Sequence, residues 1–139
     1  MRVVIDTSEL LRMAAGGSSS HLLMRWHDRK FELLMSLATL TELRTVLSRP
    51  AIQKYVAPPV GDEFLTLLEQ RATLVQPDLT APTCRDPRDS SLIATAVGGQ
   101  AEFLVTADSD LLDDPTLAAT LAERGVKVLR AAEFLEKTN

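Results

Sequence analysis

The sequence predicts an α/β fold, a three-layer α/β/α sandwich around a mostly parallel sheet of about four to five strands. Short apolar runs alternate along the chain with segments of helical periodicity, as they do where crossover helices connect parallel strands. The runs are short and rich in Val, Ile and Leu, which is typical of strands buried on both faces. With 139 residues and no repeat or linker, the chain is expected to form one domain over 1–139.

The first half of the chain is expected to begin with a buried strand, because the β-branched run RVVI ends abruptly at Asp6. The next segment places Leu10, Leu11 and Ala14 at helical spacing before the GGSSS stretch of residues 16–20, which we expect to form a mobile loop. The same signals predict a helix at 21–30, a strand at 31–36, a helix at about 38–49 and, between prolines, helices at 51–56 and 61–72.

The second half repeats the alternation. The expected elements are a strand at 73–77, a helix at 87–97, a strand at 102–106, a helix at 115–124, a strand at 126–129 and a terminal helix at 131–137. Parallel strands end at a common edge of the sheet, and in such folds the functional crevice lies beyond that edge. The residues that directly follow strands are therefore the first candidates for a site.

The composition narrows the class of protein. Nineteen acidic residues against fifteen basic ones give a net charge of −4, so nucleic acid would have to be bound by local contacts or through a metal ion. No apolar run approaches the roughly 18 residues of a membrane span, and MRVVID is not a secretory signal. A single cysteine, Cys84, excludes an internal disulfide and agrees with a cytoplasmic location.

Four acids from distant parts of the chain are expected at the same edge of the sheet. Asp6 follows the first strand, Asp108 follows the strand at 102–106, and Glu42 and Asp89 lie near the starts of helices. Each of these candidate acids also has a structural alternative at a helix start or turn: Asp6 with Glu9, Thr39 with Glu42, Asp86 before Pro87 with Asp89 three residues on, and Asp108 at a short turn. Capping explains each acid alone but does not explain why they converge.

Carboxylates gathered in one crevice repel one another, and some take up protons unless a cation neutralises them. Oxygen ligands of this kind suit Mg²⁺ or Mn²⁺. His21 and His27 lie six residues apart, which is not the spacing of a shared zinc site, and no phosphate-binding glycine motif is present. Metal held by carboxylates can activate water for hydrolysis of a phosphodiester, and no protein nucleophile is then required.

Four stretches resemble, in order, the motifs of PIN-domain ribonucleases. They are VVIDTSELL, SLATLTELRTVLSRP, CRDPRDSSLIATAV and FLVTADSDLL. The last two are most similar to VapC-like toxins of toxin–antitoxin pairs. The resemblance implies a PIN-like fold, metal-assisted hydrolysis of single-stranded or looped RNA, a homodimer, and inhibition by a cognate antitoxin protein whose tail enters the acidic groove.

The resemblance also implies roles for individual residues. Asp6, Glu42, Asp89 and Asp108 would hold one or two Mg²⁺ or Mn²⁺ ions, with Asp110 as an accessory acid. Thr7 or Ser8 would hydrogen-bond the first Asp or a phosphate, and Thr106 would orient the last acid. Ser90 stands where many relatives carry an acid or Asn, so the third ligand is Asp89 or, as the second choice, Asp86.

Basic residues near these motifs are candidates for contacts with phosphate, or alternatively for ion pairs on solvated helix faces. They are Arg12, Arg44, Arg49, Arg85 and Arg88. Two other functions remain open at this point. One is a catalytically weak or inactive PIN-like module that binds RNA or protein, and the other is a DNA-directed nuclease similar to flap endonucleases.

Overall fold

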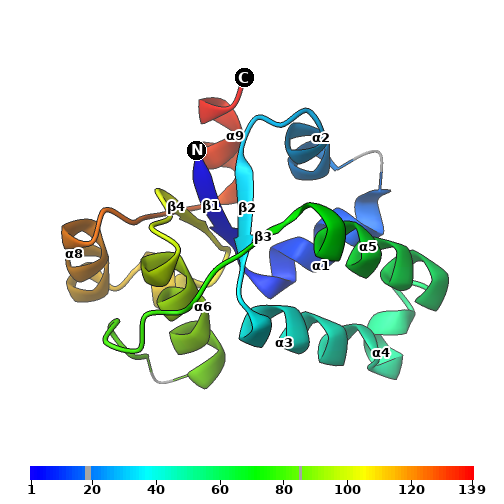
Figure 1. The fold of residues 1–139 in the computed structure, drawn as a ribbon, viewed down its shortest axis with the longest axis horizontal. Helices are drawn as coiled ribbons and strands as arrows, with labels where there is room; N and C mark the ends of the chain where they lie inside the picture. Colours follow the sequence, from blue (N-terminus) through cyan, green and yellow to red (C-terminus); the bar gives the residue numbers. More distant parts are fainter. Residues whose placement is uncertain (18–19, 85) are drawn as a thin grey trace.

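A five-stranded parallel sheet forms the centre of the protein in the computed structural model, which describes residues 1–17, 20–84 and 86–139 (Figure 1). The strands are β1 (Arg2–Ile5), β2 (Glu32–Met35), β3 (Thr73–Leu74), β4 (Phe103–Val105) and β5 (Lys127–Leu129). Their order is β3-β2-β1-β4-β5, and every pair is parallel. The predicted α/β fold is confirmed, with a sheet that is entirely rather than mostly parallel over the described residues.

Nine helices are found in the described residues. They are α1 (Thr7–Gly16), α2 (His21–His27), α3 (Leu37–Leu47), α4 (Pro50–Gln53), α5 (Pro58–Arg71), α6 (Pro87–Gly98), α7 (Ser109–Leu112), α8 (Pro115–Glu123) and α9 (Ala131–Lys137). No helix of the described part is long and apolar enough to cross a membrane.

The sheet separates two apolar cores, because successive residues of a strand face opposite sides. Val3 and Ile5 of β1 pack into the core that α1, α2, α3, α5 and α9 cover, whereas Val4 packs into the core that α6, α7 and α8 cover. The helices of each layer can be followed in Figure 1. Three layers result, as the alternating pattern predicts.

Several elements end earlier than the sequence suggests. The helix expected over 21–30 stops at His27, because Arg29 has a positive φ of 58° that a helix does not allow. The strand expected over 73–77 keeps only Thr73 and Leu74. The amide of Val75 still donates to the carbonyl of Met35 at 2.8 Å, and Pro77, which has no amide hydrogen to donate, lies two residues farther along. The short α4 forms at Pro50–Gln53 rather than over 51–56.

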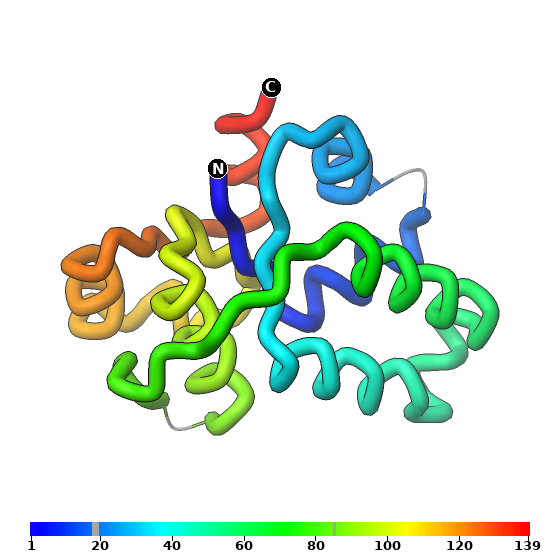
Figure 2. Tube along the Cα trace, in the orientation of Figure 1, coloured from blue at the N-terminus to red at the C-terminus, as the bar shows by residue number. Residues whose placement is uncertain are grey.

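The connection from β3 runs alongside α6 on its way to the start of that helix (Figure 2). The amide of Asp78 donates to the carbonyl of Ala94 at 2.9 Å. Gly98 permits this close approach, because a Cβ there would lie 2.0 Å from the carbonyl oxygen of Gln76. The contact fixes α6, whose first turn carries Asp89, against the sheet.

The connections after β1 and β4 leave toward opposite layers, α1 on one face and α7 on the other. These two strands are neighbours at the centre of the sheet, so their carboxyl ends flank a switch point of the kind that holds ligands in parallel α/β folds. A buried hydrogen bond between Ser36 Oγ and Thr95 Oγ1, 2.8 Å long, joins the start of α3 to α6 beside this point.

Candidate active site

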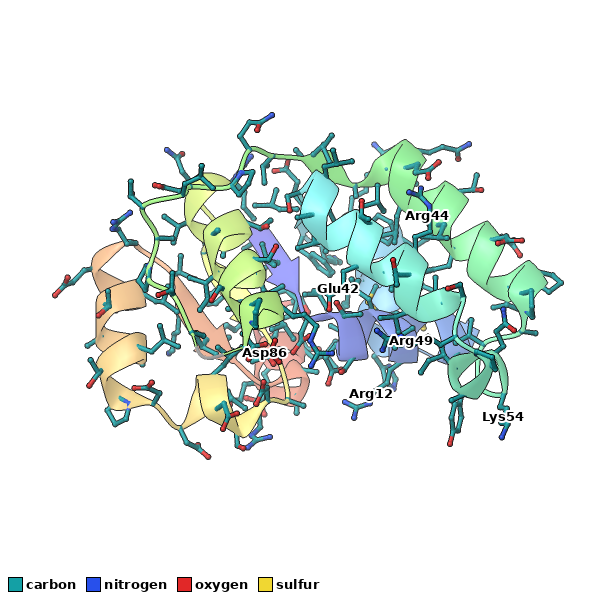
Figure 3. All side chains as sticks on the ribbon, turned by 90° about the horizontal axis from the view of Figure 1, so that it is seen from below. Arg12, Glu42, Arg44, Arg49, Lys54 and Asp86 are labelled. Atoms are coloured by element: carbon teal, nitrogen blue, oxygen red, sulfur yellow. The ribbon has the colours of Figure 1, made fainter. Side chains whose placement is uncertain are left out.

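A cavity of about 470 Å³ opens at the switch point between the starts of α1 and α6, the side of α3 and the segment after β4. Five carboxylates line it: Asp6, Glu42, Asp86, Asp89 and Asp108. Figure 3 shows two of them, Glu42 on α3 and Asp86 at the start of α6. The structure thus brings together the acids that the sequence placed at one edge of the sheet.

Thr106 connects the first and last of these acids. Its side-chain hydroxyl donates to Asp6 Oδ2 at 2.6 Å and accepts a hydrogen bond from the backbone amide of Asp108 at 3.0 Å. Thr106 is completely buried, so this hydroxyl has a fixed position. The predicted orienting role therefore reaches the Asp6 carboxylate itself and only the backbone of Asp108.

Asp6 does not act as the cap that its spacing to Glu9 suggested. It precedes α1 but makes no side-chain cap hydrogen bond, and the buried Glu9 pairs with Arg12 instead. The capping box predicted for these two residues is wrong, because Thr106 holds the Asp6 carboxylate at the cavity.

Replacing Thr106 tests this connection. Thr106→Val keeps the shape but leaves Asp6 Oδ2 and the Asp108 amide without their partner, so we expect a loss of about 1–2 kcal/mol in the free energy of unfolding. RNA cleavage, the activity that the family resemblance implies, should fall roughly tenfold, because a positioned carboxylate is lost. Thr106→Ser retains the hydroxyl and should keep most of the stability and most of the activity. Chemical denaturation and the cleavage rate measure the two effects. Equal losses in the Ser and Val variants would contradict the role of the Thr106 hydroxyl.

Asp89 lies on the first turn of α6 and faces Asp108. Burial, the neighbouring charge of Asp108 and a hydrogen bond with Asp108 raise the pKa of Asp89 from its ordinary value to about 7, and Asp86 and Asp6 add to the effect. At neutral pH the metal-free site therefore retains a proton on this pair for much of the time. A bound cation would favour the charged form of Asp89.

Glu42 occupies the sixth position of α3, in its second turn rather than in the first. Burial raises its pKa, Arg88 opposes the rise, and the charges of Asp6 and Asp86 add to it. The capping box predicted for Thr39 and Glu42 is wrong, since Ser36 and Thr39 form the box at the start of this helix. Glu42 is left facing the cavity.

Asp86 is the cap of α6, as its position before Pro87 predicts. Its Oδ1 accepts the backbone amide of Arg88 at 2.9 Å, and its Oδ2 pairs with Arg88 Nη2 at 2.9 Å. Both hydrogen bonds with Arg88 lower the pKa of Asp86. Asp86 is therefore already paired with a cation, whereas Asp89 is hydrogen-bonded to another carboxylate, Asp108.

Ser90 is turned away from this cavity. Its Oγ accepts the amide of Cys84 at 2.7 Å and donates to the carbonyl of the same residue at 3.2 Å. It does not line the cavity that contains Asp89 and instead secures the segment before α6. Ser90 therefore has a structural role, and its side chain does not compete with Asp89.

Three of the predicted basic residues line the cavity, and one does not. Arg12, Arg49 and Arg88 are in the lining, whereas Arg44 pairs with Glu69 on α5 at 2.6 Å and lies apart from the site (Figure 3). Arg85 is outside the described residues, as are Ser18 and Ser19 of the predicted mobile loop.

Other predicted residues vary in placement. Thr7 and Ser8 line the cavity, although neither is hydrogen-bonded to Asp6 among the described contacts. Asp110 lines a separate cavity of about 640 Å³, and its amide donates to Asp108 Oδ1 at 2.9 Å. The sequence-based reasoning missed the apolar wall of the site, Leu11 and Val46, although Val46 lies four residues after Glu42 on the same helical face.

The donor set suits a hard divalent cation, because all the acidic side chains offer oxygen. In the described part of the chain no group of three or more Asp, Glu, His or Cys side chains is close enough to hold a metal ion as it stands. Burial raises the pKa of both Asp89 and Glu42, and the charges of neighbouring carboxylates add to the rise. The residues present fit a divalent ion if Asp89 loses its proton and the carboxylates move closer together.

The comparison with protein-family models decides the family. A model described as PIN domain matches residues 2–110, more than half of the chain and a range that includes every acid of the cavity. This chain belongs to the PIN domain family. PIN domains are generally nucleases, a class of hydrolase, and they typically use divalent metal ions. The comparison with curated proteins gives no match.

Proposed function

We propose that this PIN domain is an Mg²⁺- or Mn²⁺-dependent endoribonuclease and the VapC-like toxin of a toxin–antitoxin pair. The observation that carries the nuclease proposal is the convergence of five carboxylates on one cavity, with the pKa of Asp89 raised to about 7 beside Asp108. Such a cluster on a family scaffold of nucleases supports a metal site.

Most acids of the cavity, its arginines and Thr106 have separate tasks in this proposal. Asp6, Glu42, Asp89 and Asp108 would hold the ion, which when bound supplies an activated water and stabilises charge on the phosphodiester. Thr106 keeps the Asp6 carboxylate in place, and Asp89 would have to be deprotonated to serve as a ligand. Arg12, Arg49 and Arg88 would contact the phosphates of the strand.

Cleavage by the purified protein tests the proposal. Single-stranded RNA should be cut with Mg²⁺ or Mn²⁺, and EDTA should stop the reaction. Matched single-stranded DNA and flap substrates should be cut at least tenfold more slowly; faster cleavage of the flap would assign the protein to DNA instead. Cleavage that persists in EDTA would exclude the metal-dependent mechanism.

A module that binds RNA or protein without cleaving is the second candidate. It is favoured by the absence of a preformed group of three acids in the described residues. Calorimetric titration separates the two functions, since a nuclease should bind Mg²⁺ in the millimolar range or tighter with release of protons from Asp89. A protein that takes up no Mg²⁺ under these conditions would be assigned to the second class.

The toxin proposal requires a cognate antitoxin, a homodimer and a cytoplasmic location. We expect a short reading frame beside this gene that encodes a small DNA-binding protein, and that protein should suppress cleavage when the two are purified together. Light scattering after size-exclusion chromatography should give twice the monomer mass. Persisting cleavage in the presence of the neighbouring gene product would contradict this pairing.

Arg44 on α3 and Arg49, two residues after the end of α3, offer a matched test of phosphate contact. Arg49→Ala should raise KM for RNA about three- to tenfold, because it removes a cation from the cavity. Arg44→Ala only breaks an exposed ion pair with Glu69 and should leave KM within twofold. Equal effects of the two variants on KM would show that position relative to the cavity does not matter.

A further inference from the structure

Two cavities meet at Asp86 and Asp89, and they differ in charge. The cavity on the α1 and α3 side carries Arg12, Arg49 and Arg88. The cavity on the α7 and α8 side carries Asp110 and Asp114, and none of its described lining residues is Lys or Arg. A polyanionic strand that reaches the shared acids therefore meets less repulsion on the α3 side, where arginines offset part of the negative charge, than on the α8 side.

Arg49 is the cation on the favourable side that is free to bind a phosphate. Arg12 pairs with Glu9 and Arg88 pairs with Asp86, whereas Arg49 makes no ion pair or side-chain hydrogen bond with a described residue. It is exposed and occupies the position just before α4. A phosphate there would gain a charge-assisted contact without displacing a hydrogen-bonded partner, and it would share the Arg49 charge with Glu42.

The surface beyond Arg49 continues with a cation and an aromatic ring. Ile52 of α4 lines the cavity, and the next turn presents Lys54 and Tyr55 to solvent. In Figure 3, Arg49 and Arg12 lie between Asp86 and Lys54, so the basic residues lead away from the acids toward α4. Tyr55 is 77% exposed, whereas no Phe or Trp of the described residues is exposed.

The backbone holds Tyr55 firmly although its ring lies in water. The amides of Tyr55 and Val56 both donate to the carbonyl of Ile52, at 2.8 and 2.9 Å. Val56 is 2% exposed and packs in the main core, which anchors the turn. A tyrosine ring on such an anchored turn is preorganised for stacking, and stacking on aromatic rings is how proteins commonly hold unpaired bases.

We propose that Arg49, Lys54 and Tyr55 form a single-strand track that guides RNA from the acidic cavity across α4, with one unpaired base stacked on Tyr55. The track rests on the proposed function and specifies its substrate class, because a base within a duplex cannot stack on a side chain in this way. Lys54 and Arg49 would contact phosphates, and Tyr55 would contribute to affinity without regard to base identity.

Binding can be measured separately from cleavage, by fluorescence anisotropy of a labelled single-stranded RNA in EDTA. Tyr55→Ala should weaken binding about tenfold, and Tyr55→Phe should stay within twofold of the wild type because the ring is retained. Lys54→Ala should weaken binding and reduce the salt dependence by about one phosphate contact. Lys30→Ala, which removes an exposed charge before β2 at the opposite end of the sheet, is the matched control and should bind normally.

The outcomes separate the track from the nuclease proposal. Unchanged affinity in Tyr55→Ala, or an equal loss for single-stranded and duplex RNA, would overturn the track even if the protein cleaves RNA with Mg²⁺. A tenfold loss that is restricted to single strands would support the track even if no metal ion supports cleavage. Unaltered thermal unfolding of the variants is expected, because the Tyr55 ring and the Lys54 side chain are exposed.

Discussion

Asp108→Asn is expected to reduce metal-dependent RNA cleavage by about a thousandfold or more. The substitution removes a negative charge that faces Asp89 in the cavity. Loss of one carboxylate ligand weakens metal binding and also weakens the stabilisation of the transition state by the ion. The two losses together raise the barrier to cleavage by several kcal/mol. The fold should be preserved, because the amide of Asp110 donates to Asp108 Oδ1 and an asparagine oxygen can accept the same hydrogen bond. Single-turnover cleavage at saturating Mn²⁺ measures the effect.

Asp110→Asn is the matched control for this variant. It makes the same chemical change two residues along, but Asp110 lines the other cavity and is exposed. We expect its activity to stay within about threefold of the wild type, which would remove Asp110 from the metal ligands that the family resemblance implies. Asp6→Asn should match Asp108→Asn. Full activity in either Asp6→Asn or Asp108→Asn would sink the assignment of the site.

The convergence of the acids could be predicted from the sequence because it depends on the regular part of the fold. Strand signals end at Asp6 and shortly before Asp108, and parallel strands have a common carboxyl edge. No knowledge of side-chain contacts is needed for that inference. What the alternation of strands and helices determines is therefore the location of the site and its main residue types.

Hydrogen-bond partners could not be predicted in the same way. The spacings of Asp6 with Glu9 and of Thr39 with Glu42 both match a capping box, yet the structure uses neither. For Asp6 the competing partner is Thr106, which is one hundred residues away and has no local signal. For α3 the signal was present, since Ser36 precedes the helix by one residue, but the expected helix start at about 38 obscured it.

The sequence alone could have predicted that Arg49 lies at the cavity and that Arg44 does not. In the helix expected over 38–49, Glu42, Val46 and Arg49 lie at i, i+4 and i+7 on one face. All three line the cavity, although α3 ends at Leu47 and Arg49 reaches the cavity from the position just before α4. Arg44 follows Glu42 by two residues and so points elsewhere, toward Glu69 of α5. Helical spacing applied to the candidate arginines would have distinguished the two.

Asp89→Asn is expected to stabilise the metal-free protein while abolishing its cleavage. An acid whose pKa is raised on folding, here to about 7, favours the folded state when it is protonated and opposes folding when it is ionised. The free-energy penalty of ionising Asp89 in the folded state is absent below about pH 4, grows as the pH rises toward 7 and is complete above pH 7. An asparagine carries no charge at any of these pH values, so the variant avoids the penalty.

The stability that Asp89→Asn gains should therefore depend on pH, and the effect of Mg²⁺ on stability should differ between the variant and the wild type. We expect Asp89→Asn to raise the free energy of unfolding by roughly 1–2 kcal/mol at pH 8, a figure reduced by solvent screening at this open cavity, and to change it little at pH 4. Mg²⁺ should raise the melting temperature of the wild type at pH 8 but not that of the variant, because the ion stabilises the folded state only where its ligands are intact. Denaturation at the two pH values with and without Mg²⁺ measures both effects.

A variant that is less stable than the wild type at pH 8 would show that Asp89 contributes structural contacts that outweigh its charge. The expected pattern would instead show that the protein tolerates a destabilising carboxylate at the position where the proposed ion is bound.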